Sequence, residues 1–169
     1  MAPGVQPIGP GSALMPRSCA GAEWFEDYLV GDEFLADPVT LSEDEIIAYA
    51  RKYDDQPIHT DPEAAARTMH GGIIAPGSQT LAVSWGSLVD SGFLKRRSLG
   101  APGVDDLRWH HPVRPGDTLQ TRARVRATRA SETRSDRGYV TFDFETTNQR
   151  GDVVMTKSIT HILPRRPGA

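Results

Sequence analysis

The sequence lacks several features that would point to particular classes of protein. It has one cysteine, Cys19, among 169 residues, so no disulfide can form within the chain and a metal site built from several thiolates is ruled out. A lone cysteine fits a reducing compartment, and we expect a cytoplasmic protein. No stretch of about 18 apolar residues is present, so we expect no membrane span. The net charge of -3 offers no strong positive field that would attract nucleic acid.

What the sequence does contain is the composition of an ordinary globular protein. Hydrophobic residues make up 38% and charged residues 24%, and the length suits one domain with a sizeable core. The first residues are rich in glycine and proline and lack the apolar centre of a signal peptide. We therefore predict a flexible tail over residues 1–23 and a single domain over residues 24–165.

The first half of the domain shows helical signals. Ser42 and Glu45 have the spacing of a capping box and are followed by apolar residues at helical intervals, which predicts a helix over residues 43–53. Pro62 is well placed to begin a short helix over 62–69. The segment 78–94 is apolar on most sides and predicts a buried central helix. A strand is expected before these helices, over residues 34–40.

The second half changes to a period of two residues. Leu119, Thr121, Ala123 and Val125 alternate with polar residues, and the same pattern recurs around Phe142. Together with the segments 99–113 and 153–163, this predicts about four strands in a meander. Antiparallel strands with one polar face fit a sheet wrapped around a single buried helix, which is an α+β fold.

The segment from Tyr53 to Asp61, "YDDQPIHTD", carries the most informative polar residues. Pro57 disfavours helix at the residue before it, so the chain should bend between Asp54 and His59. A carboxylate and an imidazole brought together by such a bend can share a water and exchange protons with it. The spacing alone leaves three interpretations open: a solvated loop, a metal site that also uses Asp55 and Asp61, or an acid–base pair. Asp61 can instead cap the helix at Pro62, which disfavours the metal.

These residues carry a resemblance to a known family. The segment "YARKYDDQPIHTDPEAA" resembles the signature of the MaoC-like dehydratases, which include the (R)-specific enoyl-CoA hydratases. Asp54 matches the family's catalytic aspartate, His59 its catalytic histidine, and Gly77 the glycine at the start of its central helix. The segment "HHPVRPGDTL" also resembles the family, and the resemblance covers residues 25–163. Gln56 stands where the family usually has asparagine, and Pro76 where many members have histidine.

The resemblance implies a hotdog fold, in which a curved antiparallel sheet wraps around a long helix. It also implies a hydratase or dehydratase that adds water to an enoyl thioester or removes it from a 3-hydroxyacyl thioester. Asp54 would be the base on a water attacking C3, His59 would orient that water and pass a proton to C2, and the Gly77 amide would stabilise the enolate. Gln56, Pro57 and Ile74 are assigned to substrate binding with Gly77.

The implied partner is an acyl-CoA or an acyl-carrier thioester, with no cofactor and no metal. The family's habits imply a homodimer or a higher homo-oligomer with the acyl tunnel near the subunit junction. Three other functions remain open: a thioesterase of the same fold, a non-catalytic acyl-thioester-binding module, and a partner subunit of a hetero-oligomeric dehydratase.

Several other polar and aromatic residues have two interpretations each. His70 could line the mouth of the site or be part of a loop. His110 and His111 point to opposite sides of a strand and are expected to pack or to lie on the surface. Arg122, Arg124 and Arg126 form a stripe that suits a solvated sheet face, or contact with the phosphates of coenzyme A. Trp85 and Trp109 are expected in the core.

Overall fold

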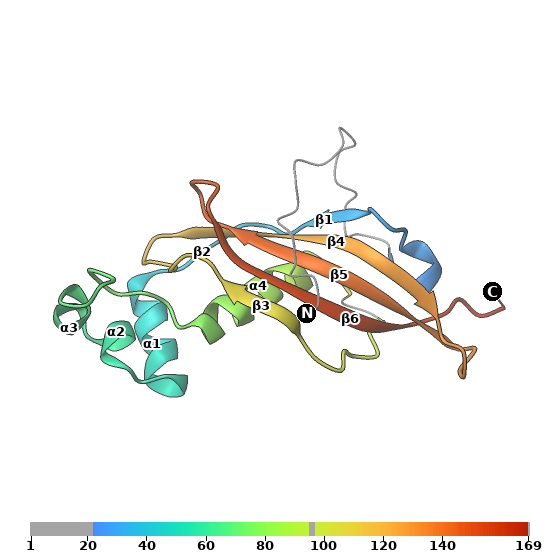
Figure 1. Ribbon diagram of the computed structural model, residues 1–169, viewed down its shortest axis with the longest axis horizontal. Coiled ribbons are helices and arrows are strands. Elements are labelled where there is room, and N and C mark those ends of the chain that lie inside the picture. Colours follow the sequence, from blue (N-terminus) through green and yellow to red (C-terminus); the bar gives the residue numbers. More distant parts are fainter. Residues whose placement is uncertain (1–21, 95–96, 169) are drawn as a thin grey trace.

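The protein is built on one antiparallel sheet. The computed structural model describes residues 22–94 and 97–168. The sheet consists of β1 (Glu33–Leu35), β4 (Thr118–Ala130), β5 (Arg137–Thr147), β6 (Val153–Pro164) and β3 (Asp105–Trp109), side by side in that order. The short strand β2 (Val39–Thr40) also pairs with β4, next to the stretch of β4 that pairs with β1. The long strands β4, β5 and β6 form its centre (Figure 1). The fold is α+β, as the sequence pattern predicts.

The alternation in the sequence matches the two faces of these strands. Ala123 lies opposite Phe144 and Val125 opposite Phe142, and all four side chains are buried. Their neighbours Arg124 and Asp143 are opposite one another on the other face. The buried face carries the core, because aromatic and β-branched side chains from adjacent strands pack there against the helix.

The helix on that face is α4 (Gly77–Asp90) (Figure 1). Its buried positions include Thr80, Ser84 and Leu88, which follow one another at intervals of four residues. Leu81 and Trp85 are only partly buried. The helix is central as predicted, but the expectation that it is buried on most sides is wrong. Thr80 and Ser84 face inward, while Leu81, Val83 and Trp85 are partly buried and pack against the edges of the core.

Three further helices gather at one end of the sheet (Figure 1). They are α1 (Glu43–Tyr53), α2 (Pro57–Thr60) and α3 (Pro62–Ala66). The predicted capping box is present, since the Ser42 hydroxyl accepts from the Glu45 amide and the Glu45 carboxylate accepts from the Ser42 amide. The α3 helix is shorter than predicted because the Thr68 hydroxyl donates to the Ala65 carbonyl and the chain turns there.

Two strand predictions are corrected by the structure. The strand expected over residues 34–40 is two short strands, separated where Pro38 removes a backbone donor. The expected meander holds for β4, β5 and β6, but β3 pairs with β6 and not with β4, its successor in the chain. The segment after β3 therefore crosses the end of the sheet to reach the far side of β5.

The expected N-terminal tail, residues 1–23, lies outside the described residues except for its last two. Of these, the Ala22 carbonyl accepts a hydrogen bond from the Tyr28 hydroxyl, and Glu23 pairs with Arg97 at 3.0 Å. Within the part of the chain that the structure describes, no helix is both long and apolar enough to cross a membrane.

Candidate active site

Asp54 owes its position to the end of α1. Its amide still donates to the Ala50 carbonyl at 2.8 Å, but its φ of -157° takes the chain out of the helix. Gln56 is extended, as expected before a proline, and Pro57 then begins α2 at its first position. His59 therefore lies in a one-turn helix where we expected a loop. The predicted bend is present and turns His59 back toward Asp54.

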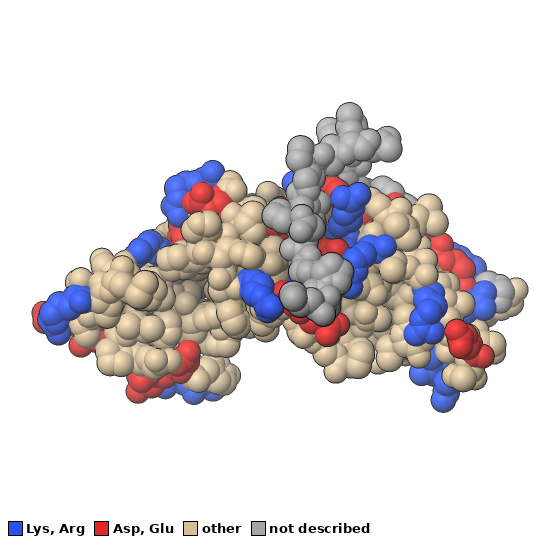
Figure 2. Space-filling view, viewed as in Figure 1, with Lys and Arg blue, Asp and Glu red and all other residues tan. Residues whose placement is uncertain are grey.

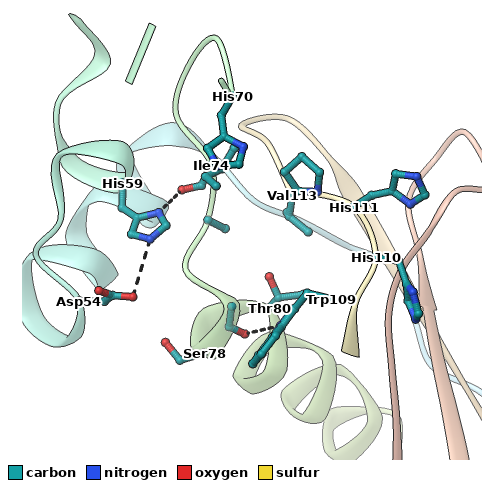
Figure 3. Close-up of a pocket in the computed structure, with 13 residues that line it drawn as sticks. Asp54, His59, His70, Ile74, Ser78, Thr80, Trp109, His110, His111 and Val113 are labelled. Carbon is teal, nitrogen blue, oxygen red and sulfur yellow. Dashed lines mark hydrogen bonds and ion pairs between the residues drawn. The ribbon is translucent and has the colours of Figure 1, made fainter. Parts of the chain in front are cut away.

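The two side chains point toward one another, as Figure 3 shows. His59 Nε2 lies 3.7 Å from Asp54 Oδ2. His59 Nδ1 lies 2.7 Å from the Ile74 carbonyl oxygen, and since a carbonyl only accepts, this nitrogen carries a proton. In the neutral ring Nε2 is then left with its lone pair toward Asp54. At this separation both atoms can hold the same water.

Gln56 fixes the carboxylate from the other side. Its Nε2 donates to Asp54 Oδ1 at 2.6 Å, which leaves Oδ2 toward His59. This amide stands where the resembling family usually has asparagine, and it reaches the Asp54 carboxylate directly. Gln56 and Pro57, which we assigned to substrate binding, are not among the residues that line the adjacent cavity. We therefore assign them a positioning role, one through a hydrogen bond and the other through the bend.

Asp54 and His59 open into a cavity of about 500 Å³. Ile74 and Gly77, both assigned to substrate binding, also line it. The site is neither deep in the core nor on the open surface, since His59 is buried while the Asp54 side chain is 31% exposed. The remaining lining residues are His70, Ala75, Ser78, Thr80, Trp109, His110, His111, Pro112 and Val113.

The first turn of α4 forms one wall of this cavity. Among the described residues, no acceptor takes the amide hydrogens of Gly77 and Ser78, and the positive end of the helix dipole lies there. Gly77 is covered by Trp109, whose indole Nε1 donates to the Gly77 carbonyl at 3.1 Å. A Cβ at position 77 would lie 2.7 Å from the indole ring, so only glycine fits beneath it.

A second wall, which adjoins the first turn of α4, comes from the end of β3 and was not found from the sequence. Trp109, which we expected in the core, is 52% exposed and lies at the cavity. His110 and His111 also line it, and each is bonded to β6: His110 Nε2 is 2.8 Å from the Thr156 hydroxyl, and His111 Nδ1 donates to the Val153 carbonyl. Local sequence could not show this, because Trp109 meets Gly77 across the fold. The only signal was that "HHPV" begins the segment "HHPVRPGDTL", which resembles the family.

The structure also decides between interpretations of other polar residues. His70 lines the cavity and its carbonyl accepts from Arg114 Nη2, so it is a part of the mouth. Asp61 caps α3, with Oδ1 accepting from the amides of Glu63 and Ala64. No group of three or more histidine, cysteine or acidic residues suited to a metal ion occurs within residues 22–94 and 97–168.

The arginine stripe lies away from the cavity. Arg124 is within 3.9 Å of Glu33, and Arg126 is within 3.1 Å of Asp143. Neither residue lines the cavity. Basic and acidic side chains are also mixed over the face that Figure 2 shows. These pairings favour the solvated sheet face over a phosphate site.

Comparison with known proteins identifies the family. The family model of the MaoC-like domain matches residues 27–147, and the chain belongs to this family. A MaoC-like dehydratase from Rhodospirillum rubrum is 36% identical, with a TM-score of 0.79 over 85% of this chain and 98% of that chain.

Two further structures identify the fold. An (R)-hydratase from A. caviae involved in PHA biosynthesis is 25% identical, with a TM-score of 0.67 over 81% of this chain and 98% of that one. The Mycobacterium tuberculosis protein Rv0216, which has a double hotdog fold, is 25% identical with a TM-score of 0.73, over 86% of this chain and 45% of that chain. The fold is a hotdog fold.

Proposed function

We propose that this protein is a hydratase or dehydratase that adds water to a trans-2-enoyl thioester, or removes it from the 3-hydroxyacyl thioester. The observation that carries the proposal is the Asp54–His59 pair, 3.7 Å apart in a cavity that also presents the free amides of a helix N-terminus. The named (R)-hydratase among the similar structures supports the same reaction class.

In the hydration direction, a water held between Asp54 Oδ2 and His59 Nε2 attacks C3 of the substrate. Asp54 accepts one of its protons while the new C3–O bond forms and the C2=C3 electrons move onto the thioester oxygen. The proton then passes through His59 Nε2 to C2, and the enolate electrons form the C2–H bond. Water has been added across the double bond, and the pair has its starting protonation again.

The enolate oxygen needs a donor that is already in place. The Gly77 and Ser78 amides are free of acceptors among the described residues, and the dipole of the fourteen-residue helix α4 adds to their field. The glycine at position 77 allows a thioester to approach the backbone closely. The Ile74 carbonyl supports the chemistry indirectly, because it holds His59 in the tautomer that leaves Nε2 facing the water.

A water-attacking thioesterase of the same fold is the nearest rival, and one assay separates the two. Loss of the enoyl absorbance and release of free thiol are followed together over short, medium and branched enoyl-CoAs. We expect loss of the double bond with no thiol release. Thiol release that depends on Asp54 would instead establish the thioesterase. No reaction across the panel would leave a binding module or a partner subunit.

We propose that the thiol of the substrate is coenzyme A or an acyl carrier. On the basis of the lone cysteine, we also propose that the protein is cytoplasmic. We also propose that the protein acts as a homodimer. The support is the edge strand β3, beside which Leu81 and Trp85 of α4 keep part of their surface exposed. A second copy placed there would cover both.

A further inference from the structure

A second cavity, of about 460 Å³, lies on the outward side of α4. Its floor is formed by β6 and its rim by the segment before β3. Most of its lining is apolar or glycine. The lining residues are Ser78, Leu81, Ala82, Trp85, Ser98, Gly100, Ala101, Gly103, Val104, Lys157, Ile159 and His161. Ser78 lines the Asp54–His59 cavity too, so the two cavities meet at the first turn of α4.

Lys157 is the unusual residue of this cavity, because its side chain has no exposed surface. Its Nζ donates to the Ser84 hydroxyl at 2.9 Å and lies 5.7 Å from the Trp85 ring and 5.3 Å from the Phe144 ring. No carboxylate of the described residues forms an ion pair with it. An ammonium has three N–H donors, and only one has a protein acceptor here. A buried cation left in this state is costly.

His161 adds a second unsatisfied group to the same cavity. Its ring is stacked on Trp85, with centroids 5.2 Å apart and planes 8° from parallel. The residue is 3% exposed, and neither ring nitrogen has a hydrogen-bond partner in the described structure. Burial lowers the pKa of His161 to about 4, and burial lowers the pKa of Lys157 to about 8. At neutral pH the His161 imidazole is therefore uncharged, while Lys157 is protonated in most molecules.

We propose that this cavity binds the far end of the acyl chain, and that this end carries a carboxylate. The inference rests on the proposed function, since the reacting end of the same substrate lies between Asp54 and His59. A carboxylate would give Lys157 its missing counter-charge and would accept the N–H of His161. A hydroxyl at the end of the chain could make the same hydrogen bonds, but it would leave the charge of Lys157 without a counter-ion.

The spacing of the two cavities suits a chain of medium length. From Ser78 to Ser84, which bonds Lys157, the helix rises about 9 Å at its usual pitch. Along this stretch Leu81 lines the cavity, as does Trp85 one residue beyond Ser84, and both would contact methylene groups. The substrate class is a medium-chain dicarboxylic acid, bound through one carboxyl as an enoyl thioester and free at the other.

Kinetics with matched substrates tests this inference. We compare kcat/KM for two enoyl-CoAs of equal length, one ending in a carboxylate and one in a methyl group. The comparison is repeated with short, medium and long chains. We expect the wild-type protein to prefer the carboxylate by roughly tenfold or more at medium length, the scale of one charge-assisted hydrogen bond. Lys157→Met should abolish this preference and leave the methyl-ended substrate equal or better. Arg129→Met, which removes a cation stacked on Tyr139 and outside both cavities, should retain it.

Binding of saturated acyl-CoAs, measured by calorimetry, separates this inference from the proposed reaction, because a saturated chain cannot be hydrated. Selective binding of the carboxylate-ended compound without any turnover of enoyl-CoAs would refute the hydratase and support the site. Equal binding of both ends by the wild-type protein would overturn the inference whatever the activity. An effect of Lys157→Met on self-association alone would overturn it too, since the second cavity would then hold a carboxylate of another copy.

Discussion

His59 illustrates how one backbone contact determines which atom a histidine presents to a cavity. The Ile74 carbonyl accepts the Nδ1 proton, so the neutral ring can meet water or substrate only with the lone pair of Nε2. Gln56 plays the matching part for Asp54 by occupying Oδ1. Oδ2 and Nε2, the two atoms proposed to act on water, are thus the ones that face one another. Neither constraint requires residues from the distant half of the chain.

Replacing either member of this pair should abolish most of the activity. We expect Asp54→Asn and His59→Gln each to lower the hydration rate by at least about 100-fold, the usual scale for losing a general acid or base. Both changes keep the size and polarity of the side chain, so the melting temperature should move little.

Asp55→Asn is the matched control, because Asp55 is the next acidic residue and does not line the cavity. Measured kcat/KM for enoyl-CoA should be close to wild type in this variant. A comparable loss in Asp55→Asn and Asp54→Asn would contradict the assignment of the base.

Gly77 should tolerate no side chain, for a steric reason. In Gly77→Ala the new Cβ would lie 2.7 Å from the Trp109 ring, so the indole must leave its bond to the Gly77 carbonyl. The methyl group would also stand beside the amide proposed to hold the enolate. We expect kcat to fall roughly 10- to 100-fold, the lower part of the range for losing an oxyanion donor.

The same helix provides the control for that variant. Gly86 has no atom within 4 Å of a Cβ position, so Gly86→Ala adds a methyl group without a clash. Since alanine favours helix over glycine, this variant should gain up to about 1 kcal/mol in unfolding free energy with unchanged activity. Equal losses of activity in Gly77→Ala and Gly86→Ala would show that any methyl group added to α4 lowers activity, and that the loss is not specific to Gly77.

At the scale of elements, the sequence predicts those whose determinants are local. Helix α1 has its predicted bounds because the Ser42–Glu45 box fixes its start and the proline bend fixes its end. The faces of β4 and β5 follow from strict alternation. The place of β3 beside β6 could not be predicted, since pairing partners far apart in sequence leave no periodic signal. The orientation of α4 was also missed, because its inward face is marked by serine and threonine.

The packing of β6 against α4 makes stability depend on pH through Lys157. Burial lowers the pKa of Lys157 to about 8 from its ordinary value of 10.5. Below pH 8 both the folded and the unfolded chain hold the proton, and the folded state bears the cost of a buried charge. As pH rises from about 8 to 10.5 the folded state loses this proton first, so this residue's contribution to the unfolding free energy rises, by at most about 3 kcal/mol.

Chemical denaturation over this pH window measures the effect. Because other groups can also change stability with pH, the quantity of interest is the difference in unfolding free energy between the wild-type protein and Lys157→Met. We expect the variant to be the more stable protein at pH 7, with the difference shrinking as pH approaches 10. A difference that does not change with pH would mean that Lys157 has an ordinary pKa.

At the scale of the whole molecule, the candidate site consists of two parts that the sequence reveals unequally. The wall formed by Asp54, His59 and Gly77 falls within segments that resemble the family, and its residues were identified before the fold was known. The wall formed by Trp109 and His110 exists only because β3 joins the far edge of β6. The buried Lys157 likewise becomes visible only when α4 is placed against the sheet.

At the same scale, the sheet ends in an unpaired edge strand, β3, where we expect a second copy to bind. Among the described strands, β3 pairs on one side only and ends the sheet, beside the partly exposed Leu81 and Trp85 of α4. An unpaired edge of this kind is a template for another strand, and a second copy paired there about a two-fold axis would extend the sheet. We therefore expect a dimer by sedimentation at micromolar concentration, with β3 of each copy at the junction.

Single cysteines can locate this junction, because a residue near a two-fold axis faces its own copy. In a Cys19→Ser background, cysteine is placed at Asp106, Leu107 and Arg108 in turn on β3, and at Leu35 on the opposite edge strand β1 as the control. Mild oxidation should join two chains for at least one β3 position, since a disulfide needs Cα atoms within about 7 Å. The Leu35 variant should stay a single chain on a non-reducing gel. Cross-linking through Leu35 but through none of the β3 positions would move the junction to β1, and with it the prediction that a second copy covers α4 would fail.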